Sequence, residues 1–210
     1  MIELYHSPST AAFLPHWLLI DLNVAHTLRS LDLGAREHKK SEYLAINPAG
    51  LVPTLVIDGV PICETAAIAL HLADAYPDAN LAPAPNTLDR ARYYQWMFFC
   101  ANTLQPAYRA WFYPDEPAGA AHVEAAKDQA RQVIENAWGR VDSHLAKQGP
   151  YLLGAKLCVV DFMLTMLMRW SRNMPKPAHT WPALAAHAAL MKQRPSFKEV
   201  YAREGLTDWT

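Results

Sequence analysis

The spacing of hydrophobic and polar positions changes along the chain and divides it into two parts. In the first eighty residues, strand-like and helix-like patterns alternate, as at Phe13, Trp17 and Ile20, which recur at helical spacing. Thr65 opens a second helix that ends at Pro77. Strands are predicted at residues 2–5, 27–31, 54–57 and 60–63. The order βαβ followed by ββα predicts a small α/β domain over residues 1–78.

The rest of the chain is helical by periodicity. Residues 79–86 are rich in Ala, Pro and Asn and predict a linker. Asn86 is the expected N-cap of a helix that carries aromatic residues as far as Tyr113 and bends at Pro106. Residues 87–210 are therefore predicted to form an all-α domain, and the fold class is α/β followed by all-α.

The amino-acid composition of the chain excludes several classes of function. The 210 residues carry a net charge of −1, without the excess of Lys and Arg that nucleic-acid-binding proteins need. Three scattered cysteines form no disulfide framework or CxxC motif, and no segment resembles a signal peptide or a membrane span. We expect a cytoplasmic protein without nucleic-acid or membrane partners. The nine histidines form no HxxxH or HExxH pair, so no metal site is predicted.

Several motifs occur in the order and spacing of one family. Asn47-Pro-Ala-Gly-Leu-Val-Pro53 precedes a hairpin, Glu64-Thr65 opens a helix, and Tyr151-Leu-Leu-Gly154 precedes Asp161. Over the whole chain this pattern resembles the cytosolic glutathione transferases. The resemblance implies a thioredoxin-like glutathione-binding domain, a helical domain that supplies the electrophile site, glutathione as co-substrate, and a homodimer.

The chemistry of the first domain fits a tripeptide thiol. A cis bond at Val52-Pro53 would turn the Val52 backbone outward, where an extended peptide can pair with it as an added strand. The Thr65 N–H, at the positive end of a helix, suits a carboxylate, and Glu64 suits an ammonium. Alone, Pro53 could be a turn proline and Thr65 a simple cap. Within the resemblance, His38, Lys39 or Lys40 lies where a basic residue meets the glycine carboxylate of glutathione, the alternative being a solvated charge run.

Activation of the thiol requires a hydrogen-bond donor after the first strand, according to the resemblance. We rank Thr10 first, Ser9 second and Ser7 third. Aligned on Pro8, the position of the cysteine of the bacterial beta class is Ala11, which argues against a cysteine mechanism. If no hydroxyl reaches the sulfur, binding without efficient conjugation is the expected outcome.

The resemblance places the electrophile site on the first helix of the helical domain. Its candidates are Tyr108, Trp111, Phe112 and Tyr113, although aromatic residues at helical spacing are often core. Asp161 is predicted to be structural, in a capping box with Cys158. The predicted function is glutathione transfer to a hydrophobic electrophile. The alternatives are isomerisation, peroxide reduction or dehalogenation on the same fold, or a noncatalytic binding protein.

Overall fold

The computed structural model describes residues 1–209 and divides them into two compact units. Unit 1 combines Met1–Ala82 with Lys192–Asp208, and unit 2 combines Pro83–Met191 with Trp209. The change of unit after Ala82 falls inside the predicted linker. The segment Lys192–Asp208, which the sequence assigns to the helical domain, packs with unit 1 instead, because its helix carries aromatic side chains that pack on the first helix.

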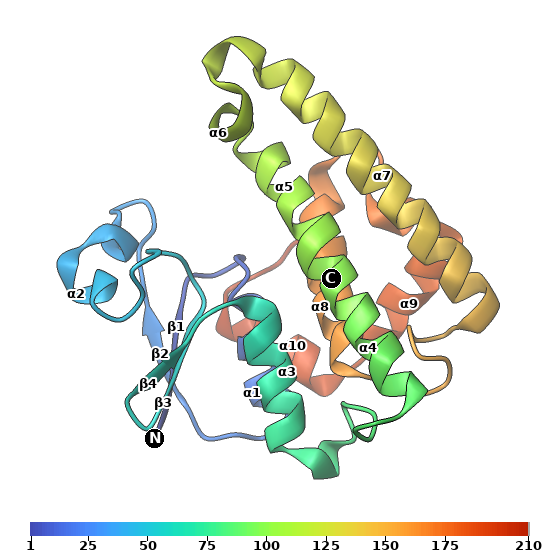
Figure 1. Cartoon of the computed structure of the whole chain (residues 1–210), viewed down its shortest axis with the longest axis horizontal. Coiled ribbons are helices and arrows are strands. Elements are labelled where there is room, and N and C mark those ends of the chain that lie inside the picture. Colours follow the sequence, from blue (N-terminus) through green and yellow to red (C-terminus); the bar gives the residue numbers. More distant parts are fainter. Residues whose placement is uncertain (210) are drawn as a thin grey trace. The chain divides into compact units, whose positions relative to one another are not determined.

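A four-stranded sheet forms the framework of unit 1 (Figure 1). Its strands are β1 (Ile2–His6), β2 (Thr27–Ser30), β3 (Thr54–Ile57) and β4 (Val60–Ile62). Their order is β2-β1-β3-β4, with β1 parallel to β2 and antiparallel to β3, and β3 antiparallel to β4. Leu4 of β1 pairs with Leu55 of β3, and both side chains are fully buried. This buried pair fixes which face of the sheet is covered.

Helices cover both sides of this sheet (Figure 1). They are α1 (Phe13–Asp21), the short η1 (Glu37–Lys39) and α2 (Ser41–Leu44), α3 (Thr65–Ala75) with η2 (Pro77–Ala79), and α10 (Pro195–Arg203). Helix α10 packs on α1 through rings: Phe13 lies edge-on to Tyr201 at 5.7 Å, and Trp17 lies edge-on to Phe197 at 5.1 Å. The Trp17 Nε1–H also donates to Ser196 Oγ at 2.9 Å. Aromatic burial and a satisfied indole therefore hold the last helix on unit 1.

Unit 2 is helical throughout. Its elements are α4 (Leu88–Phe99), the π-turn η3 (Cys100–Leu104), α5 (Gln105–Phe112), α6 (Asp115–Ala118), η4 (Ala120–His122), α7 (Val123–Gln148), α8 (Val159–Trp170), η5 (Ser171–Asn173), η6 (Ala178–Thr180) and α9 (Pro182–Lys192). The N-cap of α4 is Thr87, whose hydroxyl accepts from the Arg90 N–H, so the prediction of Asn86 was wrong by one residue. The π-turn precedes Pro106, where the wider turn accommodates the proline ring. Among residues 1–209, no helix combines the length and apolarity needed to cross a membrane.

Helix α8 runs through the core of unit 2, and Asp161 fixes its start. Both carboxylate oxygens accept buried backbone N–H groups, Oδ1 from Leu152 at 2.9 Å and Oδ2 from Cys158 at 2.8 Å. Burial raises the pKa of Asp161, whereas the charge of His187 and these two N–H donors lower it. The predicted structural role of Asp161 at the N-terminus of this helix agrees with these bonds.

Replacing Asp161 by Ala should destabilise unit 2, because two buried N–H groups lose their acceptor at about 1–3 kcal/mol each. Urea unfolding should show a loss of at least about 2 kcal/mol. The control is Asp128→Ala, on the exposed surface of α7, where about 0.5 kcal/mol or less is expected. Equal stability of the two variants would contradict the role assigned to Asp161.

Candidate functional site

The register of the strands brings the segments that carry the candidate site residues to one end of the sheet. His6, the last residue of β1, pairs with Ser30 at the end of β2. Beside them, Tyr5 pairs with Thr54 at the start of β3. Ile62, the last residue of β4, pairs with Leu55. The loop after β1, the turn before β3 and the start of α3 therefore lie at the same end of the sheet.

The loop after β1 contains the three candidate hydroxyls. Thr10 Oγ1 donates to the Ser7 carbonyl at 2.6 Å and accepts from the Ala12 N–H at 3.2 Å. Ser9 has a φ of 63°, and its N–H donates to Glu204 Oε2 at 2.9 Å. Among residues 1–209, the Ser7 hydroxyl has no hydrogen-bond partner. The hydroxyl proton of Thr10 is thus engaged within the loop, whereas that of Ser7 is not.

A buried hydrogen-bond cluster holds the turn that leads into β3. The Val52-Pro53 peptide bond is cis, as predicted. The Tyr43 hydroxyl donates to the Leu51 carbonyl at 2.6 Å and lies 2.8 Å from Thr54 Oγ1. Asn47 Nδ2 donates to the same two acceptors, at 2.8 Å and 3.0 Å. Tyr43 and Asn47 both donate to the Leu51 carbonyl, so the backbone of Val52, the next residue, is held in one position.

The start of α3 has an unusual backbone conformation. Glu64, the N-cap of α3, has a φ of 70° and a ψ of 113°, and its side chain is exposed. Non-glycine residues in this region cost about 1–3 kcal/mol and concentrate at ligand sites. The next residue, Thr65, is buried at the first turn, where backbone N–H groups lack intrahelical partners. The geometry therefore offers an exposed carboxylate beside N–H donors.

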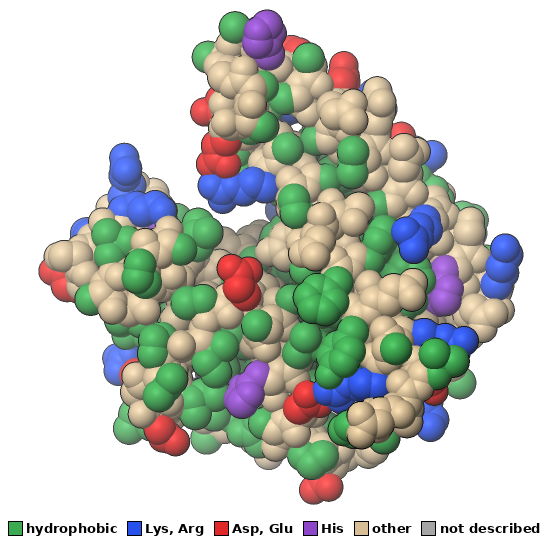
Figure 2. All heavy atoms as spheres, in the orientation of Figure 1, with side chains coloured by type: hydrophobic (Ala, Val, Ile, Leu, Met, Phe, Trp, Pro, Cys, Tyr) green, Lys and Arg blue, Asp and Glu red, His purple; other side chains and the backbone are tan. Residues whose placement is uncertain are grey.

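The basic segment lies against the turn before β3. Lys39 Nζ donates to the carbonyls of Ala49 and Gly50, at 3.2 Å and 2.8 Å. Gly50 has a φ of 57°, and a Cβ there would lie 2.7 Å from the His38 carbonyl, so the close approach requires glycine. Desolvation, and then the charges of Lys39 and Arg36, lower the pKa of His38. Figure 2 shows basic side chains gathered over this α2 end of unit 1.

The aromatic residues predicted to bind the electrophile differ in burial: one lies in the core of unit 2 and the others lie at its surface. Tyr108 is fully buried, packs against Trp138 and Trp170 and accepts from Trp138 Nε1 at 3.3 Å; burial raises its pKa. Phe112 and Tyr113 are about half exposed, at 48% and 50%. The structure thus places Tyr108 in the helical core. It leaves the rings of the two later residues accessible on α5 and just after it.

Two further aromatic contacts define the surface near α5. The Arg109 guanidinium lies 4.5 Å from the Tyr113 ring centroid, and its Nε donates to Glu116 at 2.7 Å. Lys127 Nζ lies 5.3 Å from the ring of Trp111, which is partly exposed. Cations thus cover one face of two of the candidate rings.

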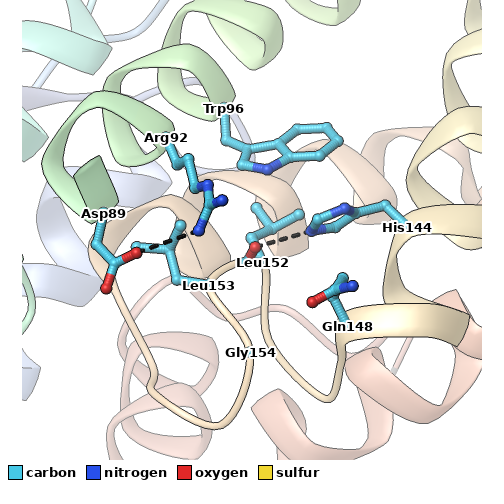
Figure 3. A pocket seen from close by; sticks show the side chains of 8 residues that line it. All are labelled: Asp89, Arg92, Trp96, His144, Gln148, Leu152, Leu153 and Gly154. Carbon is cyan, nitrogen blue, oxygen red and sulfur yellow. Dashed lines mark hydrogen bonds and ion pairs between the residues drawn. The ribbon is translucent and has the colours of Figure 1, made fainter.

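Unit 2 also has a pocket of about 320 Å³ that the sequence did not predict (Figure 3). Trp96 and His144 lie side by side in its lining, with ring centroids 4.6 Å apart, and Arg92 pairs with Asp89 at 3.4 Å. His144 is fixed by a 2.8 Å hydrogen bond to the Leu152 carbonyl. None of the predicted site residues lines this pocket.

Two matches to known families decide the identity of the chain. The glutathione S-transferase N-terminal domain matches residues 1–74, and the glutathione S-transferase C-terminal domain matches residues 101–204. The chain belongs to the glutathione S-transferase family. This result confirms the predicted fold class, a thioredoxin-like domain followed by a helical one, and the prediction of an enzyme of this family.

Individual glutathione S-transferases resemble the chain over nearly its full length. GstA of Escherichia coli O157:H7 is 28% identical over 207 residues, which cover 98% of this chain and 100% of the relative. A sphingomonad enzyme solved in complex with glutathione has a TM-score of 0.85 at 29% identity, covering 98% of this chain and 100% of that one. BphK, a bacterial enzyme solved as a ternary complex, has a TM-score of 0.87 at 31% identity, with 97% and 100% covered. Glutathione as co-substrate agrees with these relatives, one of which was solved in complex with glutathione.

Sequence reasoning missed the residues that position the site. Tyr43 and Thr54 carried no recognised signal, and Asn47 was interpreted only as part of a turn motif. Glu204 lies 195 positions from Ser9, to which it is hydrogen-bonded, so no local pattern links them. The side chain of Asn47 was the one available signal, because Asn before Pro in a turn commonly bonds to its own backbone, as it does here to the Ala49 N–H.

Replacing Asn47 by Ala should loosen the turn before β3. The Leu51 carbonyl and Thr54 Oγ1 each lose one donor, at about 0.5–1.5 kcal/mol per hydrogen bond, so the free energy of unfolding should fall by about 1–3 kcal/mol and retention on immobilised glutathione should weaken. Asn136→Ala, on the exposed face of α7, is the control. Unchanged stability and retention in the Asn47 variant would show that the cluster does not support the site.

Proposed function

We propose that this protein conjugates glutathione to a hydrophobic electrophile. The observation that carries the proposal is the meeting, at one sheet edge, of the hydroxyl loop, the Val52-Pro53 turn and the Glu64-Thr65 helix start in a chain of this family. In the proposed pose, the glutathione backbone pairs with Val52 as an added strand. Its γ-glutamyl carboxylate meets the Thr65 N–H and hydroxyl, and its ammonium meets Glu64.

The glycine end of glutathione lies at His38 and Lys39 in this proposal. His38 is the better donor, because its ring makes no hydrogen bond among residues 1–209 and its lowered pKa favours a neutral ring with one N–H to give. The Lys39 ammonium already donates hydrogen bonds to the carbonyls of Ala49 and Gly50. Its contribution is then to hold the turn and to add positive charge near the carboxylate.

Thr10 is proposed to stabilise the thiolate, with Ser9 and Ser7 as alternatives. Lowering a thiol pKa by about 2 units requires roughly 2.7 kcal/mol of stabilisation of the anion. A hydrogen bond to a charged group is worth about 1.5–3 kcal/mol, so one well-placed hydroxyl supplies much of it. The Thr10 proton would exchange its bond to the Ser7 carbonyl for one to the sulfur.

The electrophile in this proposal lies against Trp111, Phe112 and Tyr113, and Tyr108 supports these residues from the core. We propose that the protein is a homodimer.

Replacing Thr10 by Ala should lower kcat/KM for a general aromatic electrophile at least tenfold, whereas Ser7→Ala should change it little. Thr10→Ser, which keeps the hydroxyl, should recover most of the activity. The pKa of the bound thiol, read from its ultraviolet absorbance against pH, should rise in Thr10→Ala alone. A loss confined to Ser7→Ala or Ser9→Ala would move the donor role to that residue.

Replacing Glu64 by Gln should weaken glutathione binding at least tenfold, because the ligand ammonium loses its anionic partner. Calorimetric titration with glutathione measures the change, and Glu42→Gln, on the exposed surface of α2, is the control. Wild-type protein that binds glutathione but turns over no electrophile would support the noncatalytic alternative. Wild-type protein that does not bind glutathione would refute both.

A further inference from the structure

Three buried side chains from distant parts of the sequence meet inside unit 1, near the hydroxyl loop. They are His6 at the end of β1, His16 in α1, and Glu204 just after α10. One nitrogen or oxygen from each lies within 4.8 Å of those of the other two, and all three residues are buried. The two imidazole rings are 5.5 Å apart between centroids.

Each imidazole has one nitrogen held and the other buried without a partner. His6 Nε2 is hydrogen-bonded to Ser30 Oγ, and His16 Nδ1 to Glu204 Oε1, both at 2.9 Å. Among residues 1–209, His6 Nδ1 and His16 Nε2 have no hydrogen-bond partner and no exposure to solvent. Buried polar atoms are rarely left in this state. His6, with Nε2 fixed by Ser30 and Nδ1 available, has the arrangement of a metal-binding histidine, whose second nitrogen is held by an acceptor. At His16 the nitrogen that faces Glu204 is Nδ1, so an ion shared with Glu204 would bind there and replace the hydrogen bond between the two side chains.

We propose that His6, His16 and Glu204 bind a divalent transition-metal ion, with Zn²⁺ the best match. Two imidazole nitrogens and one carboxylate are ligands that Zn²⁺ accepts, whereas Mg²⁺ and Ca²⁺ prefer oxygen alone. The buried carboxylate supplies negative charge opposite a cation. At Zn–ligand distances of about 2.0–2.2 Å, tetrahedral ligand atoms lie about 3.3 Å apart, so small side-chain rotations would draw the cluster together.

Such an ion would join three elements of unit 1. It would tie the end of β1 to α1 and to the segment after α10, beside the Ser9 N–H that donates to Glu204 Oε2. An ion that binds only the folded state raises the stability of that state by mass action. This proposal does not depend on glutathione transfer, because none of the three residues belongs to the proposed glutathione or electrophile contacts.

The test uses the full-length protein, treated with a chelator and dialysed into buffer without glutathione or other thiols. Titration with Co²⁺ should give visible d–d bands that saturate at one ion per chain and that Zn²⁺ abolishes by competition. Zn²⁺ should also raise the melting temperature. His6→Asn should weaken Co²⁺ binding at least tenfold and remove the melting shift, while His71→Asn, on the exposed face of α3, should behave as wild type.

Absence of a saturable Co²⁺ spectrum in the wild-type protein would overturn the proposal. Equal binding by His6→Asn and wild type would also overturn it, since the ion would then lie on surface histidines. Glu204→Gln is a second variant, but it removes a buried acceptor and can impair folding. His6→Asn leaves the His16–Glu204 bond in place and therefore decides the outcome. Glutathione binding by the same variants, measured without metal, separates this result from the proposed transferase function.

Discussion

The pairing of Leu4 with Leu55 is the contact on which the rest of unit 1 depends. Both side chains are fully buried, and a slip of one residue between β1 and β3 would turn one of them to the opposite face. This register places the ends of β1, β2 and β4 and the start of β3 at the same end of the sheet. The burial of this pair therefore brings together the hydroxyl loop, the Val52-Pro53 turn and the start of α3. The chemistry of the site is thus a consequence of strand pairing.

Local patterns predicted the features of this site that depend on near neighbours. The cis bond before Pro53, the helix starting at Thr65 and the capping role of Asp161 each follow from a few adjacent residues. The supports of the site come from long-range contacts, such as that of Glu204 with Ser9, and no periodicity or motif reports them. For the same reason the sequence did not show that α10 packs in unit 1: its rings pack against α1, whereas its sequence shows only another amphipathic helix.

The geometry of Thr10 sets a limit on how strongly one hydroxyl can activate a thiol. Its proton already makes a neutral hydrogen bond to the Ser7 carbonyl, worth about 0.5–1.5 kcal/mol. Exchanging that bond for one to a thiolate, worth about 1.5–3 kcal/mol, leaves a net gain of roughly 1–1.5 kcal/mol. Such a gain lowers a thiol pKa by about 1 unit. A larger shift requires a second donor to the sulfur besides Thr10.

Glu204 connects this loop to the buried interior. Its carboxylate is fully buried and accepts from the Ser9 N–H, while its other oxygen lies against His16. A buried anion is tolerated only when a positive charge or several donors compensate it. The metal ion proposed between His6, His16 and Glu204 would provide that charge and hold Glu204 where it accepts from the Ser9 N–H. The hydroxyl loop is therefore linked to the buried cluster through Glu204, whose carboxylate joins the Ser9 N–H to His16.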